Sequence, residues 1–366
     1  MKLAIISDTH FGYARFEEDS YIQAENAFLD ADKKADLIIY AGDVFDTKTP
    51  KLETLNRAVE ILKKVKKPIF AIHGNHERRS KGMVNPAQLL ATMGAFRYLH
   101  GEAAEFDNLG EKVQIFGLGN VPEELASIAL KKALENFKPN PNALKILVLH
   151  QSIKELIPNA ENEISLEELE TLPFDLIING HIHGKLTKLG GRFIIPGSTV
   201  VTQLKKDETA PRGYVLYDTK AKTHEFVEIT CRKFFYEELE FKDAGIEEIK
   251  KIVEEKIKEL KKLDNSAIIR IKIKGTAREG LTSSDITFVN RDDVYLDNHL
   301  NATTLKDKLE RIKRIKDQKI SVKELAIKEL EEKIKDKIKL FSPRDLFDKL
   351  VIGTDETLEY LKSENK

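Results

Sequence analysis

The sequence predicts an α/β layered fold for the first 230 residues, followed by a small α+β unit and a charged helical tail. Continuous runs of Val, Ile and Leu alternate with amphipathic stretches as far as Glu228, which is typical of buried parallel strands and covering helices. The pattern changes past Cys231, and from Leu305 onward no strand signal remains. A length of 366 residues favours two or three domains, which we place at 1–230, 231–304 and 305–366.

Five apolar runs in the first domain are predicted to be strands buried on both faces. They are LAIIS (3–7), DLIIY (36–40), PIFAI (68–72), KILVLH (145–150) and DLIING (175–180). Helices are predicted at Tyr21–Lys34 and Lys51–Lys64, between the first three strands. The second helix carries Leu52, Leu55, Val59 and Leu62, a stripe that we expect to face the core.

The second domain is predicted to hold a strand at 234–241, a helix at Asp243–Leu263 and a strictly alternating strand at 267–275. A last strand is expected within Asp285–Leu296. On the alternating strand one face carries Ile269, Ile271 and Ile273, and the other carries Arg270, Lys272 and Lys274. This basic face could contact phosphates, or it could be an ordinary solvated face.

The third domain is predicted to be helical and mildly basic over Lys306–Lys339, with an apolar stripe at Ile327, Leu330, Ile334 and Ile338. Ser342 is predicted to cap a further helix that has Pro343 at its first position and carries Leu346, Phe347, Leu350 and Val351 on one side. These apolar faces could pack on the chain's own second domain or dock into a partner's groove.

Composition excludes several classes of protein. Sixty Lys and Arg residues against sixty-one Asp and Glu residues leave a net charge of −1, so bulk positive charge cannot hold this chain on DNA. No run approaches the ~20 apolar residues of a membrane span, so no membrane association is expected. The single cysteine, Cys231, allows no intrachain disulfide and no cysteine-built zinc site. We therefore expect a reduced, cytoplasmic location.

Polar residues follow each of the five predicted strands of the first domain. In chain order they are Asp8 and His10, Asp43, Asn75 and His76, His150, and His181 and His183. Ligands of open α/β sheets bind beyond the carboxyl ends of the strands, so adjacent strands would bring these groups into one crevice. A lone histidine at a strand end is usually structural, but five such ends together argue against that interpretation. Gly42, Gly74 and Gly180 lie where the chain must bend sharply or approach a ligand closely.

Imidazole, carboxylate and amide groups without a thiolate favour divalent Mn, Fe, Zn or Ni. Two such metals about 3.5–4 Å apart need a bridging carboxylate, for which Asp43 is the candidate. A pair of this kind activates water at neutral pH and neutralises the charge of a phosphoryl group in the transition state.

The motifs D-x-H, G-D, G-N-H, H and G-H-x-H, in this order, resemble the signature of the calcineurin-like metallophosphoesterases. The resemblance covers about the first 230 residues and implies a layered β-sandwich core flanked by helices. It implies that His76 does not bind metal but acts on the scissile phosphate as proton donor or charge stabiliser. The two implied metal sites share one carboxylate: one consists of Asp8, His10, Asp43 and His183, and the other of Asp43, Asn75, His150 and His181.

D-T-H-F-G-Y, A-G-D-V-F-D, H-G-N-H and I-P-G-S-T (Ile195–Thr199) are similar to the DNA double-strand-break repair nucleases of the meiotic-recombination-eleven family, SbcD-like in bacteria. This resemblance implies a chromosome-associated exo- and endonuclease with two Mn²⁺ ions per chain, for which Mg²⁺ or another divalent metal could substitute. Its substrates would be DNA ends and single-stranded DNA, and the second domain would be a cap over the crevice. Arg78 and Arg79, after G-N-H, could contact phosphate or be plain surface charges.

The same resemblance implies a homodimer and a coiled-coil, SMC-like ATPase partner bound through the C-terminal helices. The candidate dimer segment is Ala87–Tyr98, for which packing in the core is the alternative. The chain departs from the family at Asp46, where His is common, and at Glu77, where Asp is common. These departures concern substrate contacts near His76 and not the metal ligands.

Two other functions remain open. A small-molecule phosphatase or cyclic-nucleotide phosphodiesterase would use the same metals but has no evident use for about 130 further residues. A non-catalytic scaffold would keep the fold and is expected to lose ligands, but the ligand set is complete.

Overall fold

The computed structural model describes residues 1–80, 82–157, 163–278, 286–288, 291–302, 327, 342–353 and 357. The chain forms two compact units. The first comprises Met1–Glu238, Val253–Lys272 and Val289–Asp297, and the second comprises Leu239–Ile252, Ile273–Phe288 and Asn298–Lys366. The domain boundaries at 230 and 304 stay a prediction.

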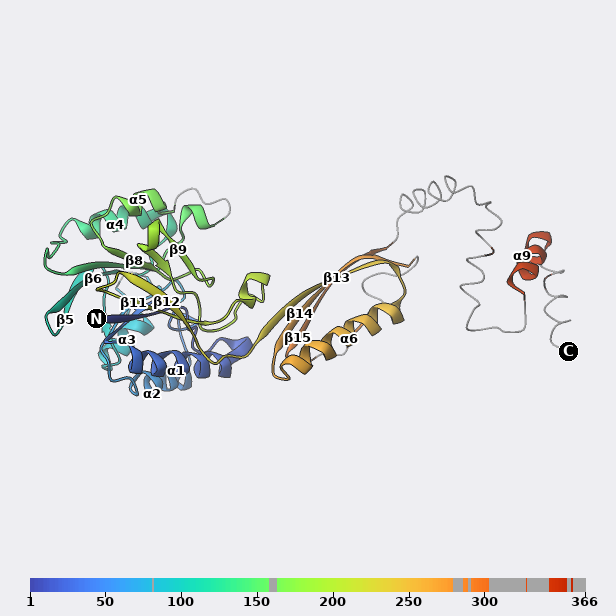
Figure 1. Cartoon of the computed structure of the whole chain (residues 1–366), viewed down its shortest axis with the longest axis horizontal. Coiled ribbons are helices and arrows are strands. Elements are labelled where there is room, and N and C mark those ends of the chain that lie inside the picture. Colours follow the sequence, from blue (N-terminus) through green and yellow to red (C-terminus); the bar gives the residue numbers. More distant parts are fainter. Residues whose placement is uncertain are drawn as a thin grey trace. The chain divides into compact units, whose positions relative to one another are not determined.

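Two six-stranded sheets form the main part of the first unit (Figure 1). The first sheet has the order β12-β11-β1-β2-β3-β4, in which β1 to β4 are parallel and β11 and β12 are antiparallel. Its strands are β1 (Lys2–Ile6), β2 (Leu37–Ala41), β3 (Ile69–Ile72), β4 (Arg97–Tyr98), β11 (Gly213–Asp218) and β12 (Thr223–Glu228).

The second sheet has the order β5-β6-β7-β8-β10-β9, with β6, β7, β8 and β10 parallel. The outer strands β5 and β9 are antiparallel to their neighbours. The strands are β5 (Glu102–Asn108), β6 (Glu111–Leu118), β7 (Leu144–Leu149), β8 (Leu176–Asn179), β9 (Leu186–Lys188) and β10 (Phe193–Ile195).

The sheets pack face to face, and helices cover their outer faces, which confirms the predicted layered fold. Leu3, Ile5, Ile39 and Ile72 of the first sheet share one buried core with Ile115, Ile146, Val148 and Ile178 of the second. Helices α1 (Glu17–Lys34), α2 (Leu52–Leu62) and α3 (Pro86–Thr92) pack on the outside of the first sheet. Helices α4 (Ala126–Leu134) and α5 (Leu166–Glu170) pack on the outside of the second. The strands are continuous apolar runs because both of their faces are covered.

All five predicted strands of the first domain are present as β1, β2, β3, β7 and β8, but they do not belong to one sheet. The first three lie in one sheet and the last two in the other. The strand-end residues therefore meet across two sheets, and not along the edge of a single open sheet. The outer strands escaped prediction because several carry mixed polar sequences, such as EAAEFDN in β5, without a continuous apolar run.

The predicted helices are confirmed with shifted ends. Helix α1 begins four residues earlier than expected, and its first turn carries Glu17, Glu18 and Asp19, which the helix dipole stabilises. In α2 the expected core stripe is wrong at Leu52, which is 79% exposed, although Val59 and Leu62 are buried. The inward face of α2 is centred on Ala58, so Leu52 lies at its margin.

A third, three-stranded sheet has the order β13-β14-β15, with β13 at Phe234–Ala244, β14 at Ile268–Ala277 and β15 at Val294–Ala302. The apolar spacing of helix α6 (Ile246–Leu263) predicts one stripe of Ile246, Ile249, Val253, Ile257 and Leu260. The last four are buried, whereas Ile246, at the first turn, is only partly buried. The alternation of β14 is confirmed, since Ile269, Ile271 and Ile273 are fully buried. The last strand was placed too early: it starts at Val294 because Asp292 and Asp293 form a turn.

In the tail the structure describes helix α9 (Pro343–Ile352), which Ser342 caps by accepting a hydrogen bond from the Asp345 backbone N–H. Most of the predicted segment Lys306–Lys339 lies outside the described residues, apart from Ile327, which is buried. Among the described residues, none of the helices has the length and apolar character needed to cross a membrane.

Gly180 marks a place where the two sheets approach closely beside the strand ends. A Cβ atom at this position would lie 2.2 Å from the Ala41 carbonyl oxygen and 2.4 Å from Ser7 Oγ. We predict that Gly180→Ala lowers the free energy of unfolding by about 1–3 kcal/mol, the usual range for overpacking. Differential scanning calorimetry would measure this as a lower melting temperature.

Gly184→Ala is the matched control, because a Cβ atom there meets nothing within 4 Å. Its melting temperature should equal that of the wild type. Equal melting temperatures for both variants would contradict the close approach of the sheets at Gly180.

Candidate metal centre

The candidate ligands lie on strand-end loops with unusual backbone conformations. The φ angles of Asp8, His10, Asp43 and His181 are 52°, 46°, 48° and 73°, in the left-handed region that side chains other than glycine seldom adopt. Such a conformation costs about 1–3 kcal/mol per residue and persists only where the surroundings enforce it. Four strained residues within one predicted ligand set indicate a functional site more strongly than any single histidine does.

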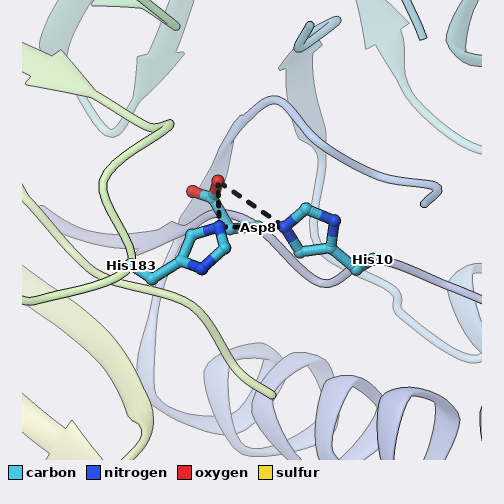
Figure 2. A group of neighbouring side chains, drawn as sticks. All are labelled: Asp8, His10 and His183. Carbon is cyan, nitrogen blue, oxygen red and sulfur yellow. Dashed lines mark hydrogen bonds and ion pairs between the residues drawn. The ribbon is translucent and has the colours of Figure 1, made fainter. Parts of the chain in front are cut away.

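The first group of side chains consists of Asp8 and His10, after β1, and His183, after β8 (Figure 2). Asp8 Oδ1 lies 4.0 Å from His10 Nε2 and 3.8 Å from His183 Nε2. The two Nε2 atoms are 3.2 Å apart. Neutral imidazoles that turn their lone pairs toward each other need a cation or a proton between them, so this group can hold a metal ion.

Asp43 lies between this group and a second one. Its Oδ2 atom is 3.8 Å from His10 Nε2 and 3.2 Å from His150 Nε2. Its Oδ1 atom accepts a hydrogen bond of 3.0 Å from the His76 backbone N–H. One carboxylate oxygen therefore faces imidazoles from both sheets.

The second group consists of Asp43, His150 and His181. Asn75 joins it, because its Oδ1 atom is 2.8 Å from His181 Nδ1 and 3.2 Å from His150 Nε2. His150 Nδ1 donates to the Ala41 carbonyl at 2.7 Å, which leaves Nε2 of the neutral ring free for a metal. In both groups the ligand atoms of the acids and histidines lie within 4.8 Å of one another.

His76 has a side chain that is 35% exposed, and with His10 and Asp43 it forms a third group of side chains that could hold a metal ion. Its Nδ1 atom donates to the Asp46 carbonyl oxygen at 2.7 Å. Its Nε2 atom is 4.0 Å from Asp43 Oδ2. The structure thus brings together all eight residues predicted from the strand ends.

Charges in the site are strongly coupled. Burial opposes ionisation of Asp43, but the imidazoles of His150, His10 and His76 outweigh it and hold the pKa of this carboxyl well below its ordinary value. Burial also opposes protonation of His150, whose pKa is nevertheless raised by Asp43 and Asp8. Burial and the neighbouring His150 lower the pKa of His181 to about 4. The site is therefore built to hold positive charge around buried carboxylates.

The donor set fits divalent metals. It offers imidazole nitrogens, carboxylate oxygens and one amide oxygen, and Cys231 is not among the grouped residues. This composition suits Mn, Fe, Zn or Ni more than Ca or a soft metal. The crowding also explains two glycines: a Cβ at Gly74 would lie 2.0 Å from Asp43 Oδ1, and one at Gly42 would lie 2.4 Å from His150 Nδ1.

Glu77 and Asp46, the two acids at which the sequence departs from the resembled family, differ in burial and in contacts. Glu77 is fully buried, and its carboxylate oxygens accept hydrogen bonds from the backbone N–H groups of Phe45 and Gly74. Burial raises the pKa of Glu77 to about 8, and Asp43 adds to the effect. Glu77 therefore ties two ligand loops together and does not reach the surface. Asp46 lies at the site, with Oδ1 3.5 Å from His10 Nδ1 and 3.6 Å from His76 Nδ1.

Sequence reasoning missed Asn120, which follows β6 and so gives a sixth strand end. The amide of Asn120 is buried, donates to the His150 carbonyl at 2.7 Å and accepts from Arg78 Nη1 at 2.7 Å. The sequence G-L-G-N at 117–120 was the available signal. Arg78 is thus held beside the site, whereas Arg79 is exposed.

Sequence reasoning also missed Glu208, which is 4% exposed. Burial opposes its ionisation, but His183, Arg212 and the Thr202 backbone N–H outweigh this and lower its pKa to about 2. No strand end precedes Glu208, so no pattern in the sequence pointed to it. The basic face of β14 also differs from expectation, because Arg270 donates to Asp297 Oδ2 and to the Leu204 carbonyl.

The sequence model of the calcineurin-like phosphoesterase family matches residues 1–185. The chain is also similar to proteins named DNA double-strand break repair protein Mre11. It is 31% identical to the one from Methanopyrus kandleri over 203 residues, which cover 50% of this chain and 44% of that protein. It is 27% identical to the one from Archaeoglobus fulgidus over 290 residues, which cover 69% of this chain and 64% of that protein.

A third relative of the same name, from Sulfurisphaera tokodaii, is 31% identical over 230 residues, which cover 58% of each chain. The match with each of these three relatives spans less than two thirds of the relative's length. The family model covers half of this chain and includes every residue of the groups that could hold a metal ion. This chain is therefore a member of the calcineurin-like phosphoesterases.

Proposed function

We propose that this chain is a two-metal phosphodiesterase that acts as a DNA exo- and endonuclease in the processing of double-strand breaks. The position of Asp43 Oδ2, between His10 Nε2 at 3.8 Å and His150 Nε2 at 3.2 Å, carries the proposal. A carboxylate shared in this way is what a two-metal phosphoesterase requires. The names of the similar proteins favour DNA as the substrate.

The two metal sites would share Asp43. One would consist of Asp8, His10, Asp43 and His183, and the other of Asp43, Asn75, His150 and His181. We propose Mn²⁺ at both sites, with Mg²⁺ or another divalent ion as a substitute. Such ions supply a nucleophile at neutral pH and neutralise charge on the phosphoryl group.

His76 would act directly on the scissile phosphate. Its Nδ1–H is engaged by the Asp46 carbonyl at 2.7 Å, so Nε2 is the atom available to the substrate. The partial exposure of its side chain leaves a path for a phosphate. We propose that Nε2 donates a proton to the leaving oxygen or stabilises the charge that develops there.

Three partners are proposed. The first is DNA, whose backbone Arg78 is positioned to contact. The second is another copy of this chain, because the candidate segment Ala87–Tyr98 exposes Leu89 and Met93, although its Ala87, Leu90 and Phe96 pack in the core. The third is a coiled-coil, SMC-like ATPase, because α9 exposes Leu350 and Val351.

The first prediction from this proposal concerns the substrate. With Mn²⁺, the protein should degrade linear DNA and should leave a chromogenic phosphate monoester largely intact, as measured by gel electrophoresis and absorbance. Asp43→Ala should abolish the DNA cleavage, because both metals lose a ligand.

Asp107→Ala is the control for this experiment, since Asp107 lies at the end of β5, where its carboxylate accepts from the Gly110 backbone N–H at 2.9 Å and lies 3.8 Å from Lys112, and it is not among the candidate ligands. Rapid ester hydrolysis without DNA cleavage would favour the small-molecule phosphatase. A wild-type protein that binds metal and cleaves neither substrate would favour the scaffold.

The second prediction separates chemistry from metal binding. His76→Ala should reduce kcat by about 10²–10⁴-fold, which is the usual contribution of general acid–base assistance. Its Mn²⁺ occupancy, measured by calorimetric titration, should equal that of the wild type. His224→Ala on β12 is the control, and a lost metal in His76→Ala would make His76 a ligand instead.

The third prediction concerns the tail. Deletion of 321–366 should leave nuclease activity on short DNA largely intact and remove binding to the ATPase, because the apolar faces that dock would be absent. The double variant Leu350→Asp/Val351→Asp should weaken the same binding in a pull-down of the purified proteins. Arg344→Ala on the same helix is the control, and undiminished binding by the truncated chain would contradict the docking role.

A further inference from the structure

A buried ion pair lies behind the metal ligand His183, outside the candidate ligand set. Glu208 and Arg212 are each 4% exposed, and Arg212 Nη2 is 3.3 Å from Glu208 Oε1. Glu208 accepts hydrogen bonds from the backbone N–H groups of Thr202 at 3.1 Å and Gln203 at 2.7 Å. Removing two charges from water is costly, so the good hydrogen bonding of this pair indicates a specific role.

The ion pair holds the backbone of His183. Arg212 Nη1 donates to the His183 carbonyl oxygen at 3.1 Å and to Ser198 Oγ at 2.9 Å. The loop that carries this ligand is therefore anchored to a planar guanidinium, whose own orientation is set by Glu208.

The same pair orients the ring of His183 through Thr202. Thr202 Oγ1 lies 2.6 Å from His183 Nδ1 and 3.3 Å from Glu208 Oε1. A neutral histidine that binds metal through Nε2 keeps its proton on Nδ1, so Nδ1–H donates to Thr202 Oγ1. The threonine hydroxyl must then donate its own hydrogen onward, and Glu208 is the acceptor that lies within reach.

The segment that carries Thr202 is attached to β14. Arg270 Nη1 donates to the Leu204 carbonyl at 2.9 Å, while its Nε donates to Asp297 Oδ2 at 2.8 Å. Val200, Val201 and Leu204 are buried in a small cluster with Phe234 and Ile268. Tyr13 also donates its hydroxyl to the Thr202 carbonyl. These residues all belong to the first compact unit.

We propose that Thr202 and Glu208 are positioning residues that fix the tautomer and orientation of His183, and that Arg270 braces their segment against β14. The consequence is that one of the two metal sites depends on a strand far from the ligands in sequence. This inference rests on the proposed metal binding, but not on the identity of the phosphate ester. Partners behind a metal ligand are typically worth 10–100-fold in affinity.

The test is titration of the full-length, metal-free protein with Mn²⁺, read by calorimetry and by the electron paramagnetic resonance of free Mn²⁺. Thr202→Val preserves the shape of the side chain and removes the hydroxyl. It should weaken one Mn²⁺ site by about 10–100-fold and leave the other unchanged. Thr202→Ser retains the hydroxyl and should bind both ions as the wild type does.

Arg270→Ala should weaken the same site by a smaller factor, and Lys272→Ala, two residues along β14, is its control. Circular dichroism would show that each variant is folded. Glu208→Gln should reproduce the loss in Thr202→Val, and combining the two substitutions should add little, because they interrupt one path.

Two results would overturn this inference without touching the proposed function. One is wild-type Mn²⁺ affinity at both sites in Thr202→Val. The other is a loss of Mn²⁺ affinity in Thr202→Ser that equals the loss in Thr202→Val at both sites. If Arg270→Ala and Lys272→Ala bind Mn²⁺ with equal affinity, Arg270 has no role in holding the Thr202 segment. A wild-type protein that binds no Mn²⁺ would overturn the proposed two-metal function as well. Binding of two ions without DNA cleavage would count against the proposed nuclease and leave this inference standing.

Discussion

The buried negative charge of Asp43 is the constraint on which the rest of the site depends. Only 2% of its side chain is exposed, and an isolated carboxylate in such a place would cost far more than the whole stability of a domain. Its Oδ2 atom therefore needs compensating positive charge, and the ring nitrogens of His10, His76 and His150 face it at 3.8, 4.0 and 3.2 Å. These histidines follow β1 and β3 of the first sheet and β7 of the second. The Asp43 carboxylate is therefore compensated only where the strand ends of both sheets lie together.

Meeting this requirement needs very close packing of backbone. Gly74 passes beside the Asp43 side chain and Gly180 passes beside Ala41, at distances that no side chain would permit. Glu77 then joins the loops after β2 and β3 by accepting one N–H group from each. Arg212, which is paired with Glu208, donates to the His183 carbonyl and so anchors the loop after β8. The ligands are thus supported by buried polar groups that would be unfavourable elsewhere.

The sequence predicts well which strand-end side chains lie together, because buried parallel strands leave a clear apolar signal and a ligand can be reached only at their ends. It does not predict which sheet each strand joins, because β3 and β7 have the same apolar character. Mixed strands such as β5 and β12 depend on their neighbours for burial and give no local signal. Glu208 and Thr202 lie near the site only through their contacts with each other and with His183. Leu52 is apolar, yet it is exposed to solvent. Periodicity cannot reveal any of these.

The division of the ligands between two sheets also has a consequence for how the chain folds. His10 and His183 are 173 positions apart, and the strands that carry them become neighbours only when the two sheets dock. Contacts of such long sequence separation form late, because the entropy of closing the loop must be overcome first. A metal ion therefore cannot act as a folding nucleus here. An ion held by these ligands would bind only the folded protein, in which both sheets are docked, and would stabilise it by mass action.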